Sequence, residues 1–246
     1  MLLSGIAPLD AQLGGVSAGR LHLLMGGPGT GKSTACLQFL LAGLRRGEPA
    51  ALVTLDGLSD LASHARSTGL NVESALRTGR LSLLRFRAEF TRLLDCAGTP
   101  DPVTDDLRRL IGDVRHGRLV IDPLTPFLAD GSASGSALSA LAEWIEELGV
   151  TAFVTYPRDV SNGCDARLDP IVQRAATIVH LARGGGRTHQ MHVVQSRTGG
   201  APGVVRYRLM PGLGLVTVDG KHPSIRPDGA GTNGDGGRVW QGASPT

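Results

Sequence analysis

The most informative stretch of the sequence is Gly26-Gly27-Pro28-Gly29-Thr30-Gly31-Lys32-Ser33, which fits the pattern G-x-x-x-x-G-K-S/T. An apolar run at residues 21–25 comes directly before it. A segment rich in apolar residues, 35–46, comes after it and stops at Gly47, a residue type that commonly ends helices. The stretch therefore predicts a strand, a glycine-rich loop and a helix in succession.

The residue types in this glycine loop, residues 26–34, predict a nucleoside triphosphate site. Glycines let successive backbone N–H groups turn toward phosphate oxygens, and the start of the following helix adds partial positive charge. We expect the whole loop, Thr34 included, to contact nucleotide, Lys32 to neutralise the β and γ phosphates, and the Ser33 hydroxyl to coordinate magnesium. The alternative is a chance glycine-rich turn, which the flanking strand and helix disfavour. The motif specifies neither adenine nor hydrolysis.

Asp122 is a second candidate magnesium ligand. It ends the apolar run at residues 119–121, and ligands of open α/β sheets bind outside the carboxyl ends of the strands. A carboxylate at the end of a strand can instead cap the loop that follows. The presence of the glycine loop in the same chain favours the metal role.

The rest of the chain predicts an α/β fold. Short apolar runs at residues 50–55, 118–122 and 150–155 alternate with helical patterns such as 136–148, and three later runs at 188–195, 204–209 and 214–218 are expected to be strands. Apolar strands that alternate with helices indicate a sheet covered on both faces. We predict a central, mostly parallel sheet flanked by helices and followed by antiparallel strands.

Length and composition predict one domain with a tail. A chain of 246 residues with 41% hydrophobic residues can bury a single large core. We assign this core to residues 1–219. Residues 220–246 are rich in glycine and proline with few apolar side chains, and we expect them to be disordered because they have little to bury.

Charge and cysteine content argue against several functional classes. The formal net charge is only +3, and acidic and basic residues are interleaved, which gives no nucleic-acid footprint. Cys36, Cys96 and Cys164 form no pair or cluster, which argues against disulfides and zinc and favours the reducing cytoplasm. No stretch approaches the roughly 20 apolar residues of a membrane helix. We expect a cytoplasmic protein with no membrane partner.

Five further stretches of the sequence match the same known family as the glycine loop does. They are Ser4-Gly5-Ile6, Leu13-Gly14-Gly15, Gly43-Leu44-Arg45-Arg46-Gly47-Glu48, residues 118–125 and Gly212-Leu213-Gly214-Leu215-Val216. Together with the loop, these stretches resemble the KaiC branch of the RecA-like ATPases from about Ser4 to Val218. The resemblance implies a RecA-like P-loop core, ATP as the ligand, and a ring or filament in which nucleotide lies between neighbouring subunits.

Two positions depart from the family pattern. Where the family carries two adjacent glutamates, one of them catalytic, this chain has Asp56-Gly57. Aspartate is one methylene shorter, and a misplacement of about 1 Å can cost on the order of a hundredfold in rate, so we expect slow hydrolysis. Where the family carries Lys-x-Arg, this chain has Gln195-Ser196-Arg197. The resemblance makes Lys32, Asp56 and Arg197 the candidate catalytic residues, with Arg197 reaching the γ phosphate of the next subunit. A turn carboxylate and an exposed loop arginine are the alternatives for Asp56 and Arg197.

Three functions fit these observations. The favoured one is a slow ATPase that acts as a nucleotide-dependent regulatory switch through self-assembly, as a homo-oligomer, or through an unidentified protein partner. The second is a DNA-repair accessory of the RadA type, for which Arg183 and Arg187 around Gly184-Gly185-Gly186 are a weak DNA-binding candidate; a turn between two strands explains that stretch better. The third is a scaffold that binds nucleotide without turnover.

Overall fold

The structure, a computed structural model, describes residues 1–67, 69–86, 109–110, 112–128, 133–157, 165–197 and 201–218. Residues 220–246, predicted to form a disordered tail, lie outside these ranges, as do Cys96 and Cys164. The domain boundary at residue 219 therefore stays a prediction.

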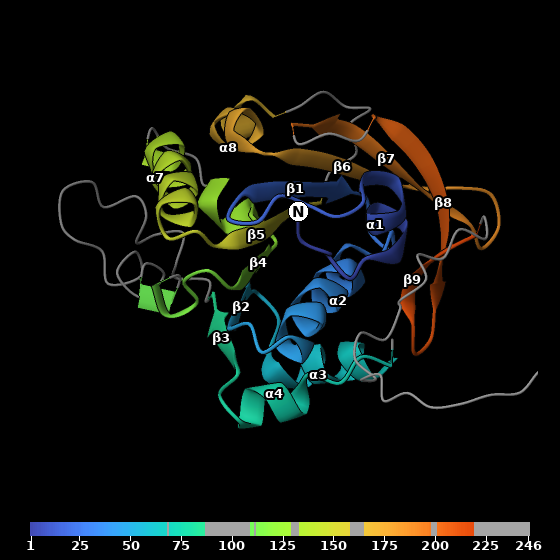
Figure 1. Ribbon diagram of the computed structural model, residues 1–246, viewed down its shortest axis with the longest axis horizontal. Helices are drawn as coiled ribbons and strands as arrows, with labels where there is room; N and C mark the ends of the chain where they lie inside the picture. The colour runs from blue at the N-terminus through green and yellow to red at the C-terminus, as the bar shows by residue number, and fades with distance from the viewer. Residues whose placement is uncertain are drawn as a thin grey trace, which may run out of the picture.

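One sheet runs through the described residues, with nine strands in the order β3-β2-β4-β5-β1-β6-β7-β8-β9 (Figure 1). The strands are β1 (Leu21–Gly26), β2 (Ala50–Thr54), β3 (Leu81–Arg85), β4 (Arg118–Asp122), β5 (Thr151–Tyr156), β6 (Thr177–Arg183), β7 (His189–Ser196), β8 (Gly203–Met210) and β9 (Gly214–Thr217). Pairing is parallel from β3 to β6 and antiparallel from β6 to β9. The prediction of a mostly parallel sheet with antiparallel strands at the carboxyl end is confirmed.

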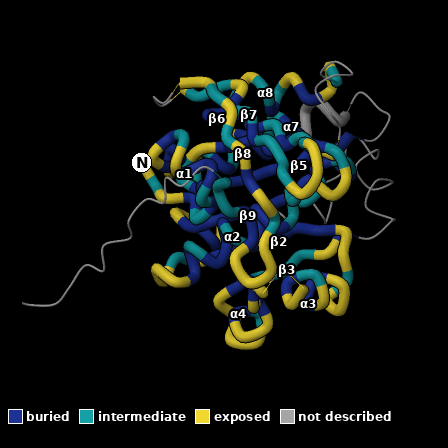
Figure 2. The backbone as a smooth tube through the Cα atoms, turned by 90° about the vertical axis from the view of Figure 1, so that its right-hand side faces the viewer, coloured by how far each residue is buried: buried dark blue, intermediate teal, exposed yellow. Residues whose placement is uncertain are grey.

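Helices cover both faces of the parallel strands. They are α1 (Ala7–Leu13), α2 (Lys32–Arg45), α3 (Leu58–Ser67), α4 (Glu73–Arg77), α7 (Ala133–Glu147) and α8 (Asp169–Arg174), with short 3-10 turns η1 (Thr125–Leu128) and η3 (Ala166–Leu168). Successive strand residues face opposite layers: Leu24 packs in the core on the α2 side, and Leu23 packs in the core on the side of α7 and α8. Strands β1, β2 and β5 are buried along their whole length, as the dark blue segments of Figure 2 show. Within the described residues, no helix combines the length and apolar character that crossing a membrane requires.

The position of β1 places the glycine loop in the middle of the sheet. β5 and β6 flank this strand on its two sides, with Gly26 opposite Leu181 of β6. After β1 the chain passes through α2 to β2, which lies on one side of β1, beyond β5 and β4. After β5 the chain crosses to β6, on the other side of β1. Ligands of open α/β sheets bind at the carboxyl edge where the strand order reverses in this way. The glycine loop lies at that edge.

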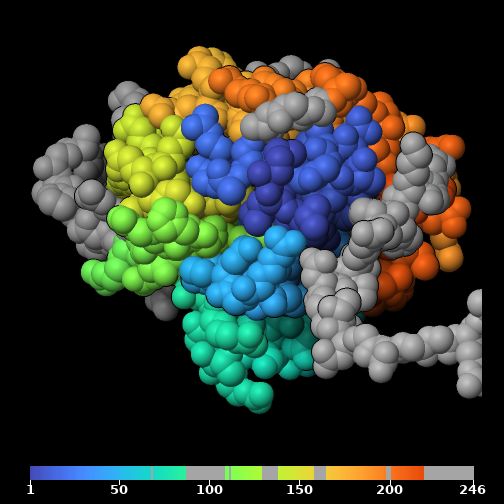
Figure 3. All heavy atoms as spheres, in the orientation of Figure 1, coloured from blue at the N-terminus to red at the C-terminus, as the bar shows by residue number. Residues whose placement is uncertain are grey.

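The amino-terminal segment packs against the last strands of the sheet. α1 contacts β8 and β9, and the Gln12 side-chain amide donates a 3.0 Å hydrogen bond to the Ala201 carbonyl. In Figure 3 the amino-terminal residues (dark blue) lie beside these strands (orange). Elements from the two ends of the described chain therefore form one continuous surface.

Arg118, the first residue of β4, ties three segments together from a fully buried position. Its Nε donates to Glu48 Oε2 at 2.6 Å, and its Nη atoms donate to the carbonyls of Leu3, Ser4 and Phe39 at 2.8–3.1 Å. The guanidinium also lies over the Phe39 ring, 4.6 Å from its centroid. The charge is thus paired and hydrogen-bonded, as a buried charge must be.

The buried His22 of β1 is expected to make stability sensitive to acid. Its ring stacks on Phe153 at 5.1 Å between centroids, its Nε2 lies 3.0 Å from the Ser17 carbonyl, and burial lowers its pKa to about 4. The unfolded chain has a histidine pKa of about 6.5, so it binds a proton first as the pH falls. The stabilising contribution is complete above pH 6.5 and is lost toward pH 4. We expect the free energy of unfolding to fall by about 2 kcal/mol between pH 7.5 and pH 5 through this residue.

Urea unfolding at both pH values measures this effect. The substitution His22→Leu should reduce the difference between the two pH values by that amount, whatever it does to stability at neutral pH. An undiminished difference in the variant would assign the acid sensitivity to other groups.

Candidate functional site

The glycine loop joins β1 to α2 with a backbone that requires glycine at several positions. Gly26, Gly29 and Gly31 have φ angles of 150°, 74° and 91°. At Gly26 an added Cβ would lie 2.4 Å from the Leu181 carbonyl oxygen, and at Gly31 it would lie 2.6 Å from a methyl carbon of Leu209. Conformation and space together exclude side chains there. Gly31 then serves as the residue before α2.

Lys32 reaches back over this loop. Its Nζ donates to the carbonyl oxygens of Gly26 at 2.7 Å and Gly27 at 3.0 Å. Burial lowers the pKa of Lys32, and the nearby Asp122 opposes that shift. The ammonium group is therefore held at the loop by backbone oxygens, where an anion within reach of the loop could compete for it.

Ser33, Asp56 and Asp122 meet at one small cavity beside the loop. The lining residues are Ser33, Cys36, Leu37, Leu52, Thr54, Asp56, Leu61, His64 and Asp122. One oxygen of Asp122 accepts a hydrogen bond from the Thr155 hydroxyl at 2.5 Å, which fixes the carboxylate at the end of β4. Magnesium favours oxygen ligands and usually combines one or two protein carboxylates or hydroxyls with phosphate oxygens. The donor set fits that ion, and the described residues hold no cluster of three or more His, Cys, Asp or Glu that could hold a metal by themselves.

Asp56 lies just after β2, on the exposed rim of this cavity. Its backbone N–H donates to the Thr54 hydroxyl at 3.1 Å, and Thr54 is the register partner of Asp122 on the neighbouring strand. The two carboxylates therefore come from the ends of adjacent strands. Whether Asp56 acts in catalysis stays a prediction.

Arg197 lies near the amino ends of the parallel strands, whereas the loop lies at their carboxyl ends. It follows Ser196, the partner of Thr177, and Thr177 pairs with His22 at the start of β1, whereas the loop follows the end of β1. The Arg197 N–H donates to the Ala176 carbonyl, and its Nη2 donates to the Gln173 carbonyl at 2.7 Å. One chain does not bring Arg197 to its own loop. A role at the phosphates would require a second chain.

Sequence reasoning missed other residues at the loop. Arg183 donates from Nη2 to the Pro28 carbonyl, Tyr207 donates to the Thr30 carbonyl, and Nε2 of His64 lies 3.4 Å from the Thr34 hydroxyl oxygen. No local pattern marks these contacts, because the partners are far apart in the chain. The stretch at residues 184–186, considered as a weak DNA-binding candidate, is the turn between β6 and β7, closed by a hydrogen bond from Gly184 N to Thr188 O. The interpretation of that stretch as a turn is correct.

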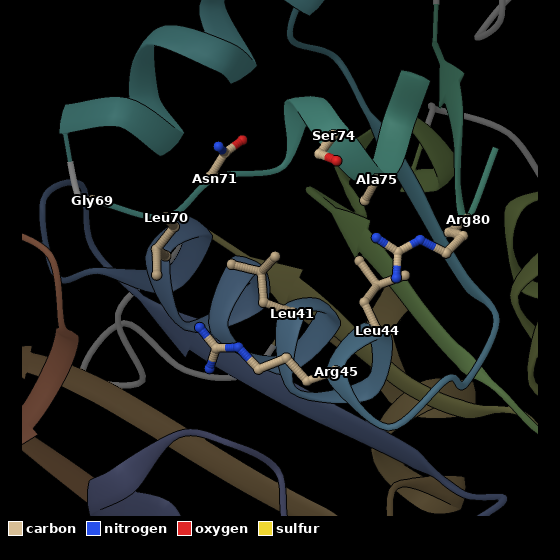
Figure 4. Close-up of a pocket in the computed structure, with 9 residues that line it drawn as sticks. All are labelled: Leu41, Leu44, Arg45, Gly69, Leu70, Asn71, Ser74, Ala75 and Arg80. Atoms are coloured by element: carbon tan, nitrogen blue, oxygen red, sulfur yellow. The ribbon is translucent and has the colours of Figure 1, made fainter. Parts of the chain in front are cut away.

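A separate hollow of about 290 Å³ lies between α2 and α4 (Figure 4). It is lined by Leu41, Leu44, Arg45, Gly69, Leu70, Asn71, Ser74, Ala75 and Arg80. None of these residues belongs to the glycine loop or to the cavity beside Ser33. The hollow is therefore not part of the candidate site.

Comparison with known proteins places this geometry in a family context. The sequence model described as "ATPase: KaiC" matches residues 2–197. A UPF0273 protein of Methanopyrus kandleri is 30% identical over 162 residues, which is 61% of this chain and 64% of that protein. A circadian clock oscillator protein KaiC of Nostoc sp. is 29% identical over 161 residues, 63% of this chain and 31% of that protein. The match thus spans less than two thirds of either relative.

The fold has a counterpart among solved structures. The crystal structure of a KaiC-like protein from the archaeon Pyrococcus horikoshii OT3 matches with a TM-score of 0.72, covering 88% of this chain and 97% of that one. The sequences are 24% identical over this match, so the likeness is one of fold.

Proposed function

Since this chain belongs to the KaiC family of ATPases, we propose that it binds ATP with magnesium at residues 26–34 and hydrolyses it slowly. One observation carries the proposal: the glycine loop, Lys32 and an oxygen-lined cavity that contains Ser33 and Asp122 lie together at the reversal point of the sheet. A chance glycine-rich turn would have no reason to share a cavity with a strand-end carboxylate.

Each residue has a distinct role in the proposal. Loop N–H groups and Lys32 bind the phosphates, while the Ser33 hydroxyl and the Asp122 carboxylate hold magnesium. When bound, magnesium would supply positive charge that stabilises the negative charge of the phosphates. Asp56 orients or deprotonates the attacking water from the rim of the cavity, and its short side chain keeps turnover slow.

The proposal extends to regulation through assembly. Arg197 is exposed at the edge of the sheet away from its own loop, a position from which it serves a neighbouring chain rather than its own. An arginine supplied across an interface stabilises transition-state charge in phosphoryl transfer. Nucleotide bound between chains in a ring or filament then changes affinity between subunits, or for a partner protein. The chain acts as a nucleotide-dependent switch, with residues 1–219 as the ATPase unit.

Light scattering coupled to size-exclusion chromatography tests this switch. We expect the mass to rise to a multiple of the single-chain mass with magnesium and a non-hydrolysable ATP analogue, and to rise less with ADP or without nucleotide. Phosphate release should be slow, and should be lost in Arg197→Ala while ATP affinity within one chain is kept, because that arginine acts only between chains.

Three outcomes would redirect the proposal. A mass that stays at one chain under all conditions contradicts the assembly and the role of Arg197. Tight, salt-dependent DNA binding that requires ATP favours the repair accessory. ATP binding without measurable phosphate release favours a scaffold without turnover.

A further inference from the structure

Two side chains from the antiparallel part of the sheet hold the outer side of the glycine loop. Arg183, at the end of β6, donates from Nη2 to the Pro28 carbonyl at 2.9 Å. Tyr207, in the middle of β8, donates its hydroxyl to the Thr30 carbonyl at 2.6 Å. These partners are 155 and 177 residues away from the loop in sequence. We name the pair Arg183 and Tyr207 the brace.

The brace fixes the direction of two N–H groups. In a trans peptide unit the C=O and the following N–H point in opposite directions within one plane. The hydrogen bond to the Pro28 carbonyl therefore turns the Gly29 N–H away from Arg183, and the bond to the Thr30 carbonyl turns the Gly31 N–H away from Tyr207. Neither N–H donates to a partner among the described residues. Both remain available to an anion on the inner side of the loop.

The loop needs such restraint because it consists mainly of glycine. Gly29 and Gly31 have positive φ angles, and glycine loses more conformational freedom than any other residue when it is fixed. Peptide planes next to glycines rotate easily unless something outside the loop holds their carbonyls. A loop that is already ordered loses less entropy when it binds phosphate.

The Tyr207 half of the brace is itself rigid. Its side chain is fully buried, and the ring stacks on His189 of β7 with 5.3 Å between centroids. Burial raises the pKa of Tyr207, so the hydroxyl stays protonated and donates. Leu209, two residues later on the same face of β8, packs against Gly31. The donor is thus fixed in position by the core of the sheet.

We propose that Arg183 and Tyr207 are positioning residues that preorganise the glycine loop for phosphate, by directing the N–H groups of Gly29 and Gly31 inward. The inference rests on the proposed function and adds to it a requirement for strands β6 and β8 in nucleotide affinity. The brace acts on N–H groups that bind the phosphates of the nucleotide and not its base. Inorganic tripolyphosphate is therefore a sufficient probe of binding.

Calorimetric titration of the full chain with a non-hydrolysable ATP analogue and with tripolyphosphate, both with magnesium, tests the brace. Arg183→Gln and Tyr207→Phe should each weaken binding of both probes about fivefold, the order expected for one hydrogen bond. In turnover assays the loss should appear in KM with kcat unchanged, because the loop is bound alike before and during reaction.

Matched control variants distinguish a loss of loop positioning from a general loss of folding or charge. Arg187→Gln removes the same charge from the turn that follows Arg183, and Tyr156→Phe removes, from the other buried tyrosine, a hydroxyl that donates to Asp165 and not to the loop. Both controls should bind as the wild type does. Arg183 is exposed, so Arg183→Gln keeps the fold even if Tyr207→Phe does not.

The outcomes distinguish the brace from the proposed function. Wild-type affinity in Arg183→Gln and Tyr207→Phe, or an equal loss in the controls, would overturn the brace alone. A wild-type protein that binds neither probe would overturn both the brace and the proposed ATP site.

Discussion

Lys32→Ala is expected to raise the Kd for ATP with magnesium by on the order of a hundredfold and to remove measurable phosphate release. In the proposed complex, the ammonium group leaves the carbonyls of Gly26 and Gly27 and neutralises two phosphates. Charge-assisted hydrogen bonds are worth roughly 1.5–3 kcal/mol each, so even one such loss approaches a factor of 100 in affinity. Fluorescence titration with a labelled ATP analogue measures the change.

The sequence offers a close control for this substitution. Lys221 is the only other lysine, and it lies outside the described residues, so Lys221→Ala makes the same chemical change elsewhere in the chain. A second variant, Asp56→Asn, should keep ATP affinity and lower turnover, because the proposal gives Asp56 a role only in hydrolysis. Retained ATP affinity in Lys32→Ala would refute the interpretation of the glycine loop.

Arg118→Ala is expected to cost about 3–5 kcal/mol of folding free energy, the range found when one partner of a buried ion pair is removed. The guanidinium is fully buried, and its loss removes one donor from each of three backbone carbonyls and leaves Glu48 without its cation. Arg118→Lys should recover only part of the loss, since an ammonium group cannot reproduce the planar, forked geometry. Urea unfolding, with the slope compared between variants, measures the cost.

An exposed arginine provides the comparison. Arg174 pairs with Glu143 and Glu146 at 2.8 and 3.6 Å, with 36% of its side chain exposed. Arg174→Ala should cost no more than about 1 kcal/mol, as surface ion pairs do. Equal costs for Arg118→Ala and Arg174→Ala would show that the buried contacts contribute nothing beyond an ordinary surface pair.

The local parts of this fold could be read from the sequence because their signals are local. The strand, loop and helix around residues 21–45 follow from an apolar run, glycines at fixed spacing and a helical pattern, all within 25 residues. Asp122 could be placed for the same reason, since a strand that ends in a carboxylate is recognisable by itself. The structure brings it to the cavity of Ser33, because the carboxyl ends of parallel strands lie at the same edge of the sheet.

Arg118, Arg183 and Tyr207 could not be predicted in the same way. Each donates to backbone carbonyls more than 75 residues away. Every residue type carries such a carbonyl, so the sequence does not show which one accepts the hydrogen bond. The sequence shows Arg118 only as the first residue of a strand. Arg197 is a third kind of case: the family resemblance implies a catalytic role, but only the strand register shows that it lies away from its own loop.

The packing of α1 against β8 and β9 also has a consequence for the newly made protein. Synthesis on the ribosome proceeds from the amino terminus, so α1 emerges long before its partners exist. Contacts of such high sequence separation form slowly and leave apolar surface uncovered in the meantime. The side of α1 that carries Leu9 and Leu13, buried in the finished core, stays uncovered by these strands until nearly all described residues have been translated. The contacts of α1 with β8 and β9 should therefore be among the last to form during biosynthesis.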